Sequence, residues 1–483
     1  MNKSYLKYKD IAPGAAEDAA VSSASGTEFS DLDFLEEKEA EKYITLEPNR
    51  WLLGGDFVNR ADRKVSFWSS QLSGDDCKFQ NPPVITIEFD EQYSSTGISM
   101  SFDSATGEYC RLVGVEWYQG NTLLSSVDFE ISSSFVFLQN TVESYSKIVI
   151  TLKETSLPNR RARVERIVFG VERVFGMTEL RSVDITNETD ISSLSLPISD
   201  MDWVLESKDP VEFLFQLKQP VECWHNDSLI GVYYIDSHRR DSRGGYSISC
   251  YDAIGVLGES TFNGGVYSNK SGKALLGEII GDDFEITYEV EDVNLTGILV
   301  SQTKREAIQQ VLFAAGWCLS TDGRDSIRIF VPSDESYEVG EDKTFPGISV
   351  STSAIVTSVS VFAHSYTQNT NGSIEVNGVK YTDTETEYVV NNPNVTANDK
   401  KNVKTVRSAT LISSSNAETV AKRLYDYYTR RNTLSAKFVW NGERLGDCIE
   451  QPTPWGTTEK GTLSQMNISM SNTVVADSRT IGL

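Results

Sequence analysis

The chain has 483 residues, with 39% hydrophobic and 10% aromatic residues, which are ordinary values for a globular protein of several domains. Its 69 acidic residues outnumber 44 basic ones, and the formal net charge of -25 argues against a nucleic-acid-binding surface. No apolar run approaches the ~20 residues of a membrane span, so we expect no membrane insertion. The charge is more simply explained as keeping a component of a large assembly in solution.

The cysteines are scattered along the sequence and include no Cys-x-x-Cys pair, so a zinc ribbon is not expected. Free, buried thiols are the usual state of such residues in a reducing compartment. We therefore predict synthesis in a cytoplasm. The cysteines stand at positions 77, 110, 223, 250, 318 and 448.

Residues 1–45 form a distinct lead segment. Small and polar residues around 12–16 and 22–26 offer little to bury, which predicts an extended or mobile segment. Residues 34–42 predict a short acidic helix with a solvated face.

Residues 46–172 show the alternation of apolar and polar residues that is typical of strands. Turn-rich pieces separate the strands, with no helix between them. This rhythm predicts an antiparallel β-sandwich. The expected strands cover 85–89, 98–102, 113–117, 148–152 and 167–169.

The same region resembles the discoidin-like (galactose-binding-like) jelly roll, in which end loops hold sugars or lipids in some members. The resemblance rests on Trp51 and on the segments FWSS (67–70), PPVITIEF (82–89) and TGISMSFD (96–103). No sugar-binding signature accompanies it, so the ligand residues are unknown. Trp51 and Trp68 have the chemistry to stack on a sugar ring, but tryptophans of a sandwich more often fill its core.

Residues 173–262 predict a second β-rich unit, a small barrel. Its expected strands cover 183–186, 194–198, 211–217, 229–235 and 246–251. Residues 263–345 then predict a small α+β insertion. A helix is expected at 273–280, and Thr303 and Glu306 form a capping box for a second helix that stops at Gly316.

Residues 346–483 return to strands and predict a second barrel. A hairpin at 374–381 has Asn377-Gly378 as its tight turn. A long helix is expected at 415–431, where Ser415 and Glu418 suggest a capping box and apolar residues repeat along one face. Further strands are expected at 355–362, 434–440, 446–449 and 461–470.

The end of this long helix combines two tyrosines with two arginines. Arg430 and Arg431 suit the negative end of the helix dipole. Tyr427 and Tyr428 are candidates for packing within or between protomers.

Catalytic chemistry is not evident in the sequence. His225, His238 and His364 stand in separate contexts, and each is expected to be a surface or satisfied polar residue. No nucleophile elbow, zinc-protease motif or Walker loop occurs. The basic cluster 238–240 is explained by a solvated loop or an interface salt bridge. We therefore expect no enzyme, no catalytic or metal-binding residues and no cofactor.

The order of barrel, α+β insertion, second β unit and long helix resembles the hub proteins of phage tail baseplates and contractile injection machines. The resemblance is sharpest at AETVAKRLYDYY (417–428), NGERLGD (441–447), TPWG (453–456) and GTLSQMNI (461–468). A discoidin-like domain ahead of the hub is similar to tail proteins of prophages in Gram-positive hosts. No peptidase, lysozyme or LysM-like segment follows the last strand.

The resemblance implies a homotrimeric ring in which each chain supplies two related barrels, so that a sixfold tail tube can stack on a threefold spike. The ring would line a conduit through which DNA passes without specific binding. Implied partners are the tail tube protein, the spike or tail-tip protein and other baseplate proteins. The implied location is the virion tail baseplate, after assembly in the cytoplasm of a bacterial host.

Two other functions stay open from the sequence. The first is an adhesin that binds a host-surface glycan through the discoidin-like domain. The second is a cell-wall hydrolase, which the missing catalytic motifs disfavour.

Overall fold

The computed structural model describes residues 4–23, 67–102, 107–208, 211, 213–323, 326–333, 335–396, 398–471 and 473–482. The chain divides into two compact units, which we call the N-terminal unit (Tyr8–Arg173 with Glu212–Leu214) and the larger unit (Met1–Lys7, Val174–Val211 and Phe215–Leu483). Strands dominate, which confirms a mainly β chain with a smaller α+β part. The finer division into five segments stays a prediction. Within these described ranges, no helix is long and apolar enough to cross a membrane.

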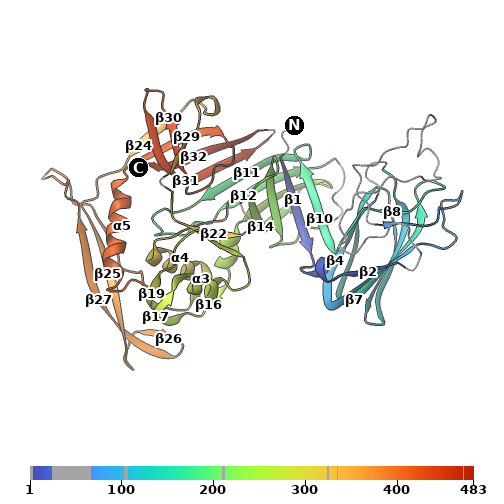
Figure 1. Ribbon diagram of the computed structural model, residues 1–483, viewed down its shortest axis with the longest axis horizontal. Coiled ribbons are helices and arrows are strands. Elements are labelled where there is room, and N and C mark those ends of the chain that lie inside the picture. Colours follow the sequence, from blue (N-terminus) through green and yellow to red (C-terminus); the bar gives the residue numbers. More distant parts are fainter. Residues whose placement is uncertain are drawn as a thin grey trace. The chain divides into compact units, whose positions relative to one another are not determined.

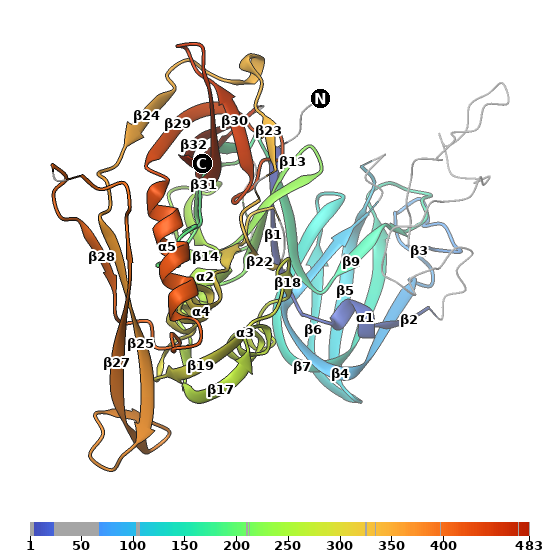
Figure 2. The same cartoon turned by 60° about the vertical axis from the view of Figure 1, so that its left-hand side comes forward.

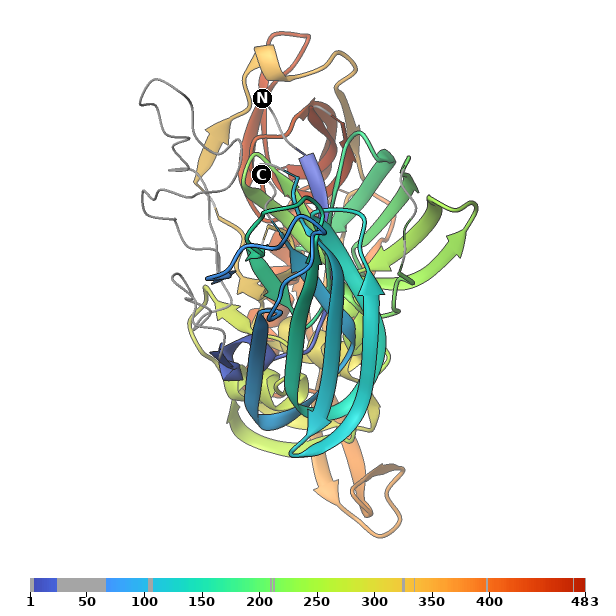
Figure 3. The same ribbon diagram turned by 90° about the vertical axis from the view of Figure 1, so that its right-hand side faces the viewer.

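The N-terminal unit is built on an antiparallel sheet with the strand order β2-β4-β7-β5-β6, and β9 pairs with β4 (Figure 3). Alternate residues of β4 such as Ile85 and Ile87 are fully buried, and so is Trp117 on β5 of the same sheet. The elements are α1 (Ala15–Asp18), β2 (Ala20–Ser22), β3 (Phe67–Trp68), β4 (Val84–Ser101), β5 (Cys110–Gln119), β6 (Thr122–Glu130), β7 (Phe135–Thr155), β8 (Arg163–Val164) and β9 (Arg166–Val168).

The strands expected at 85–89 and 98–102 belong to one long strand, β4. Its pairing with β7 shifts register between Glu88 and Gly97, so the strand continues through bulges where the sequence suggests a turn. Gly97 has a φ of +151°, and a Cβ there would lie 2.3 Å from the carbonyl oxygen of Leu138. Only glycine permits this close pairing.

The larger unit contains a continuous sheet with the order β13-β14-β15-β12-β11-β31-β32-β29-β24 (Figure 1). Two more strands join the sheet beside this order: β30 also pairs with β31, and β23 pairs with β30. The first strand group is β11 (Leu180–Glu188), β12 (Asp200–Glu206), β13 (Pro220–His225), β14 (Ser228–Arg240) and β15 (Gly245–Tyr251). The second strand group is β23 (Ser336–Glu338), β24 (Ser349–Thr352), β29 (Asn432–Val439), β30 (Cys448–Pro452), β31 (Thr458–Met470) and β32 (Val474–Gly482).

The two strand groups meet where β11 pairs with β31 in antiparallel register, from Asp184 opposite Ser469 to Glu188 opposite Gln465. The Ser469 hydroxyl donates to Asp184 Oδ1 at 2.9 Å across a sequence separation of 285 residues. The groups that the sequence suggests as two barrel units therefore share one hydrogen-bonded sheet.

An α+β part completes the larger unit. Its helices are α2 (Ala253–Gly258), α3 (Gly272–Ile280), α4 (Lys304–Ala315) and α5 (Ala417–Thr429), with the 3-10 turn η1 (Glu341–Lys343) elsewhere in the chain. Its strands are β16 (Thr261–Phe262), β17 (Gly265–Ser271), β18 (Ile286–Tyr288), β19 (Asn294–Leu299), β20 (Gln302–Thr303), β21 (Cys318–Ser320), β22 (Ile327–Phe330), β25 (Ser358–Gln368), β26 (Ile374–Val376), β27 (Val379–Asn391) and β28 (Val403–Val406).

The long helix α5 lies along β25 and β27, as Figure 2 shows. Its buried residues are Ala417, Val420, Ala421 and Leu424. They belong to one hydrophobic core with the buried faces of α2, α3 and α4. The helix predicted beside the second barrel therefore packs into the α+β core.

The two predicted capping boxes have different outcomes. At α4 the Thr303 side chain accepts from the Glu306 amide while Glu306 accepts from the Thr303 amide, so this capping box is confirmed. The capping box predicted at Ser415 and Glu418 is wrong, because the helix starts one residue later, with Asn416 as its N-cap. The Ser415 hydroxyl instead bonds the hydroxyl of Ser413 at 2.7 Å.

Two strands expected in the first barrel do not form. Residues 194–198 make a loop whose carbonyls serve helix α4, since Arg305 Nε donates to the Leu196 oxygen at 2.8 Å. The described residues of 211–217 form no strand either. Phe215 there is buried among aromatic rings, 5.5 Å from Trp203 and 5.0 Å from Tyr246. The alternation of apolar residues thus reflects packing and not sheet pairing.

Several other predictions are confirmed. Asn377 and Gly378 have positive φ angles of 50° and 78°, as a tight hairpin turn requires. All six cysteines are free, and five of them are buried. The acidic helix expected at 34–42 and the side chains of Trp51 and Trp68 lie outside what the structure describes.

Candidate functional site: a polar sheet face

One face of the continuous sheet is polar across six neighbouring strands, β15, β12, β11, β31, β32 and β29, and we call it the polar face. Its side chains lie in rows because the strand registers align them. One row runs from Ser249 through Asp202 and Asp184 to Ser469. The next row runs from Asp200 through Thr186, Asn467 and Asp477 to Lys437.

Carboxylates dominate the charged groups on the polar face. Six exposed carboxylates stand against three exposed cations, and serines, threonines, asparagine and glutamine fill the space between them. The carboxylates belong to Asp184, Glu188, Asp200, Asp202, Glu206 and Asp477, and the cations to Arg181, Lys437 and Arg479.

Hydrogen bonds hold several of these carboxylates in place. Ser249 Oγ donates to Asp202 Oδ1 at 2.6 Å, and Lys437 Nζ lies 3.4 Å from Asp477 Oδ2. Partial burial raises the pKa of Asp200; the hydrogen bond from Thr186 lowers it, and the neighbouring charge of Asp202 raises it further. The polar face is therefore an ordered anionic surface.

The opposite side of the same strands is apolar and buried, because side chains of a strand alternate between the two faces. Ile185, Trp203 and Met466 on this side are each no more than 1% exposed. In the first strand group the buried side is aromatic: Trp203 lies 5.6 Å from Phe175, and Phe215 lies between them and Tyr246. Because the apolar side chains pack on one side of the sheet, the polar face lies on the side that is exposed to solvent.

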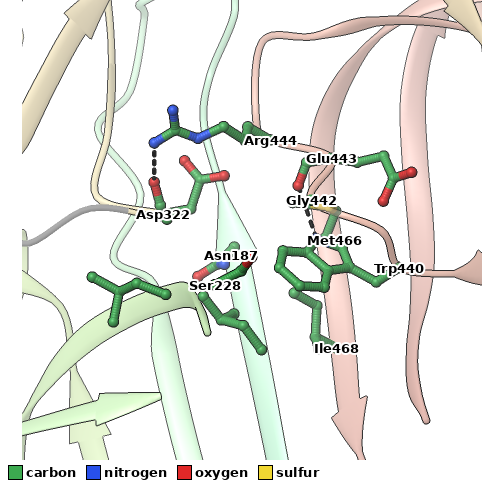
Figure 4. Close-up of a pocket in the computed structure, with 12 residues that line it drawn as sticks. Asn187, Ser228, Asp322, Trp440, Gly442, Glu443, Arg444, Met466 and Ile468 are labelled. Carbon is green, nitrogen blue, oxygen red and sulfur yellow. Dashed lines mark hydrogen bonds between the residues drawn. The ribbon is translucent and has the colours of Figure 1, made fainter. Parts of the chain in front are cut away.

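A pocket of about 280 Å³ lies beside the joint between β11 and β31 (Figure 4). Several of its polar groups have protein partners: Arg444 donates to the Asp322 carbonyl at 3.1 Å, and Trp440 Nε1 donates to the Glu443 carbonyl at 2.9 Å. Asn187 Nδ2 is buried there without a hydrogen-bond partner. Burial raises the pKa of Asp322 to about 6, and its carboxylate accepts from the Leu445 amide at 2.9 Å. These contacts connect the α+β part to the second strand group.

The three histidines occupy separate places. His225 bonds Ser4 at 2.8 Å and Asn226 at 3.0 Å, and burial lowers its pKa. The basic cluster 238–240, His238 included, lies at the end of strand β14, so the solvated loop predicted there is wrong. Arg239 in this cluster lies 2.8 Å from Asp241 in an exposed salt bridge.

His364 has acidic neighbours that the sequence did not suggest. Its ring lies 2.7 Å from Asp383 and 2.8 Å from the Arg407 carbonyl, and Glu385 lies opposite it on β27. Both ring nitrogens are hydrogen-bonded to these protein groups, and Arg407 Nε donates to Glu385 Oε2 at 2.7 Å. The cluster is therefore a polar network between β25, β27 and the segment that precedes α5, in which Asp383 Oδ1 is buried without a hydrogen-bond partner.

No protein-family model matches the sequence, and no curated protein is significantly similar to it. Several solved structures are similar to this chain over part of its length. A tail protein from Neisseria meningitidis MC58 is 11% identical, covers 64% of this chain and 93% of its own, and has a TM-score of 0.46. A prophage MuSo2 tail protein from Shewanella oneidensis is 10% identical, with coverages of 64% and 95% and a TM-score of 0.46. Prophage tail protein gp18 from Listeria monocytogenes is 9% identical, with coverages of 63% and 91% and a TM-score of 0.42.

Proposed function

We propose that the chain is a structural protein of a phage tail, a baseplate hub whose ring joins the tail tube to the spike or tip. The segments 417–428, 441–447 and 461–468 that resemble the hub family support this function. The observation that carries it is the polar face, which continues without interruption across both strand groups.

The arrangement suits a ring of three chains. Each chain contributes two strand groups joined by β11 and β31, so a homotrimer presents six groups. Such a ring matches a sixfold tube on one side and a threefold spike on the other. In this assembly the polar face would line the central channel.

The chemistry of the polar face suits the passage of DNA. Carboxylates such as Asp184 and Asp202 repel phosphates, while serine and asparagine side chains keep the surface wet. The cations Lys437 and Arg479 are too few to neutralise a run of phosphates. DNA would therefore slide past this face without being held.

The role is one of assembly and not of catalysis. The proposed partners are two further copies of the chain, the tube protein, the spike or tip protein and other baseplate proteins, and the proposed place is the tail baseplate of a virion assembled in bacterial cytoplasm. The jelly-roll character of the N-terminal unit is part of the same proposal.

Native mass spectrometry of the full-length chain tests the ring, and we expect a homotrimer. A monomer at every protein concentration and salt concentration, with or without the tube protein, would contradict the proposal.

Charge reversal tests the polar face. The double variant Asp184→Lys/Asp202→Lys should retain a DNA duplex in a gel-shift assay at low salt, where the wild-type chain does not. Asp282→Lys/Glu291→Lys is the matched control with the same change of charge, because both residues are exposed in loops of the α+β part and away from the rows of the polar face. Equal behaviour of both variants would show that the face does not control contact with DNA.

A further inference from the structure

A second pocket of about 270 Å³ in the larger unit is basic, although the chain carries a net charge of -25. Four cations line it: Lys404 on β28, Arg430 and Arg431 after α5, and Arg479 on β32. We call it the arginine pocket. Tyr427, Tyr428, Asn402, Ser353 and Thr433 add hydroxyl and amide groups to its wall.

Three of the four cations are each positioned by a different local contact. Arg431 Nε donates to the Ser353 carbonyl at 2.9 Å, and Arg430 Nη1 lies 3.5 Å from the Thr462 hydroxyl. The Lys404 amino group lies 5.5 Å from the centre of the Tyr428 ring. A guanidinium has five N–H donors, so these contacts leave most donors of both arginines available.

Acidic residues do not line the arginine pocket. Among the residues that the structure describes, no carboxylate lies within ion-pair distance of any of its four cations, whereas many other cations of the chain are paired, such as Arg181 with Glu206 and Arg328 with Glu289.

Two carboxylates interact electrostatically with residues of the pocket, but both have other partners. Asp190 acts electrostatically on Tyr427, but it accepts hydrogen bonds from the Ser192 and Ser195 hydroxyls. Asp399 feels the charge of Arg431 and accepts from Thr396.

The helix dipole explains only part of this arrangement. The C-terminus of α5 carries roughly half a negative charge, which favours one or two cations in its last turn. The last turn itself holds no cation, but Arg430 is the C-cap residue and Arg431 follows it, so both stand just beyond this end of the helix. Lys404 and Arg479 come from separate strands, so the helix dipole does not explain why they line the same pocket.

We propose that the arginine pocket binds a multiply charged anion of the phosphate class. Planar guanidinium groups match the oxygens of a phosphate in bidentate geometry, and a lysine adds a point charge. Four positive charges are better balanced by a phosphate or pyrophosphate than by a single carboxylate of a protein partner. The tyrosine and threonine hydroxyls donate to the remaining oxygens.

Two sources could supply the phosphate. Arg479 also belongs to the polar face, next to Ser435 and Gln465, so a backbone phosphate of DNA on that face could reach it. A free phosphate or pyrophosphate would enter the pocket directly. Both sources use the same donors.

Isothermal titration calorimetry of the full chain with pyrophosphate at low salt tests the site, with a short DNA duplex and a poly-glutamate peptide as parallel ligands. We expect saturable pyrophosphate binding that Arg479→Gln weakens by about tenfold, in line with the loss of one charged pair. Arg430→Gln/Arg431→Gln should abolish it. Among the described residues the Arg479 side chain makes no protein hydrogen bond, and the Arg479 carbonyl, which accepts from Ser464 Oγ, is kept in the variant, so the fold should stay intact for this comparison.

Arg181→Gln is the matched control, because Arg181 is exposed and already paired with Glu206. The pyrophosphate affinity of this variant should equal that of the wild type. Binding of pyrophosphate alone assigns the phosphate to a free anion and agrees with a polar face that does not hold DNA. Binding of both pyrophosphate and duplex, each weakened by Arg479→Gln, assigns the phosphate to DNA and contradicts the proposed sliding surface, not the arginine pocket. Absent binding, unchanged binding in Arg479→Gln, or tighter binding of poly-glutamate would overturn the proposal.

Discussion

The polar face and the arginine pocket belong to the same unit and share Arg479, yet their charges are opposite. Six carboxylates dominate the polar face, whereas the arginine pocket has four cations and no acidic wall. The difference arises from which segments meet. The register of neighbouring strands brings Asp184, Asp200 and Asp202 together. The cations come together because the end of α5 lies beside β28 and β32. The net charge of a chain therefore does not predict its local charge.

The largest expected effect comes from breaking the support beneath the polar face. Trp203→Ala removes a buried ring from the aromatic cluster and should lower the free energy of unfolding by about 3–5 kcal/mol. Hydrogen exchange of β12 and β15 should accelerate, while α5 beside the arginine pocket keeps its protection. Urea denaturation and exchange mass spectrometry measure both.

Trp455→Ala is the control, since that ring is 54% exposed and its removal should change stability by at most about 0.5 kcal/mol. Equal losses in the two tryptophan variants would mean that the aromatic cluster does not hold the face.

Stability should depend on pH through the buried carboxylate of Asp322, in contrast to the exposed carboxylates of the polar face. Burial raises the pKa of Asp322 to about 6, above its unfolded value, so its protonation adds stability that is full below pH 4 and lost as the pH rises through 6. Asp322→Asn should flatten the stability profile between pH 4 and 6 by roughly 1–3 kcal/mol, because an amide does not titrate. Its oxygen can still accept from the Leu445 amide.

Thermal unfolding across this pH window measures the effect of Asp322→Asn. Asp252 is also buried with its pKa raised to about 6, so Asp252→Asn should flatten the same window, and the double variant should flatten it further. A wild-type profile that already lacks this slope would contradict the assignment.

The smallest effect is expected on the polar face itself. The pKa of Asp200 is raised by partial burial and by Asp202, so its ionisation costs stability, which is lost as the pH rises through that raised pKa. Asp200→Asn should raise the free energy of unfolding at pH 7 by at most about 0.5 kcal/mol, because solvent screens the repulsion. Asp477→Asn, which loses the contact with Lys437, should give no gain, and a gain in both variants would exclude like-charge repulsion as the cause.

Local patterns predicted local structure well. The helices at 273–280 and 303–315, the hairpin turn at Asn377-Gly378 and the strands at 229–235, 246–251 and 461–470 all form, because spacing and turn chemistry act over a few residues. Predictions failed where a neighbour competed. Residues 194–198 give their carbonyls to α4, Phe215 packs into an aromatic cluster, and Ser415 bonds Ser413 in place of capping α5.

The sequence by itself determined a mainly β chain, its α+β part, free buried thiols and the lack of catalytic motifs. Only the tertiary structure decided that β11 pairs with β31, that the carboxylates of both strand groups form one surface, and that Lys404 and Arg479 face the end of α5. The physical reason is that side-chain alternation fixes which face a residue takes within its strand, while the neighbour across the sheet depends on pairings between distant segments.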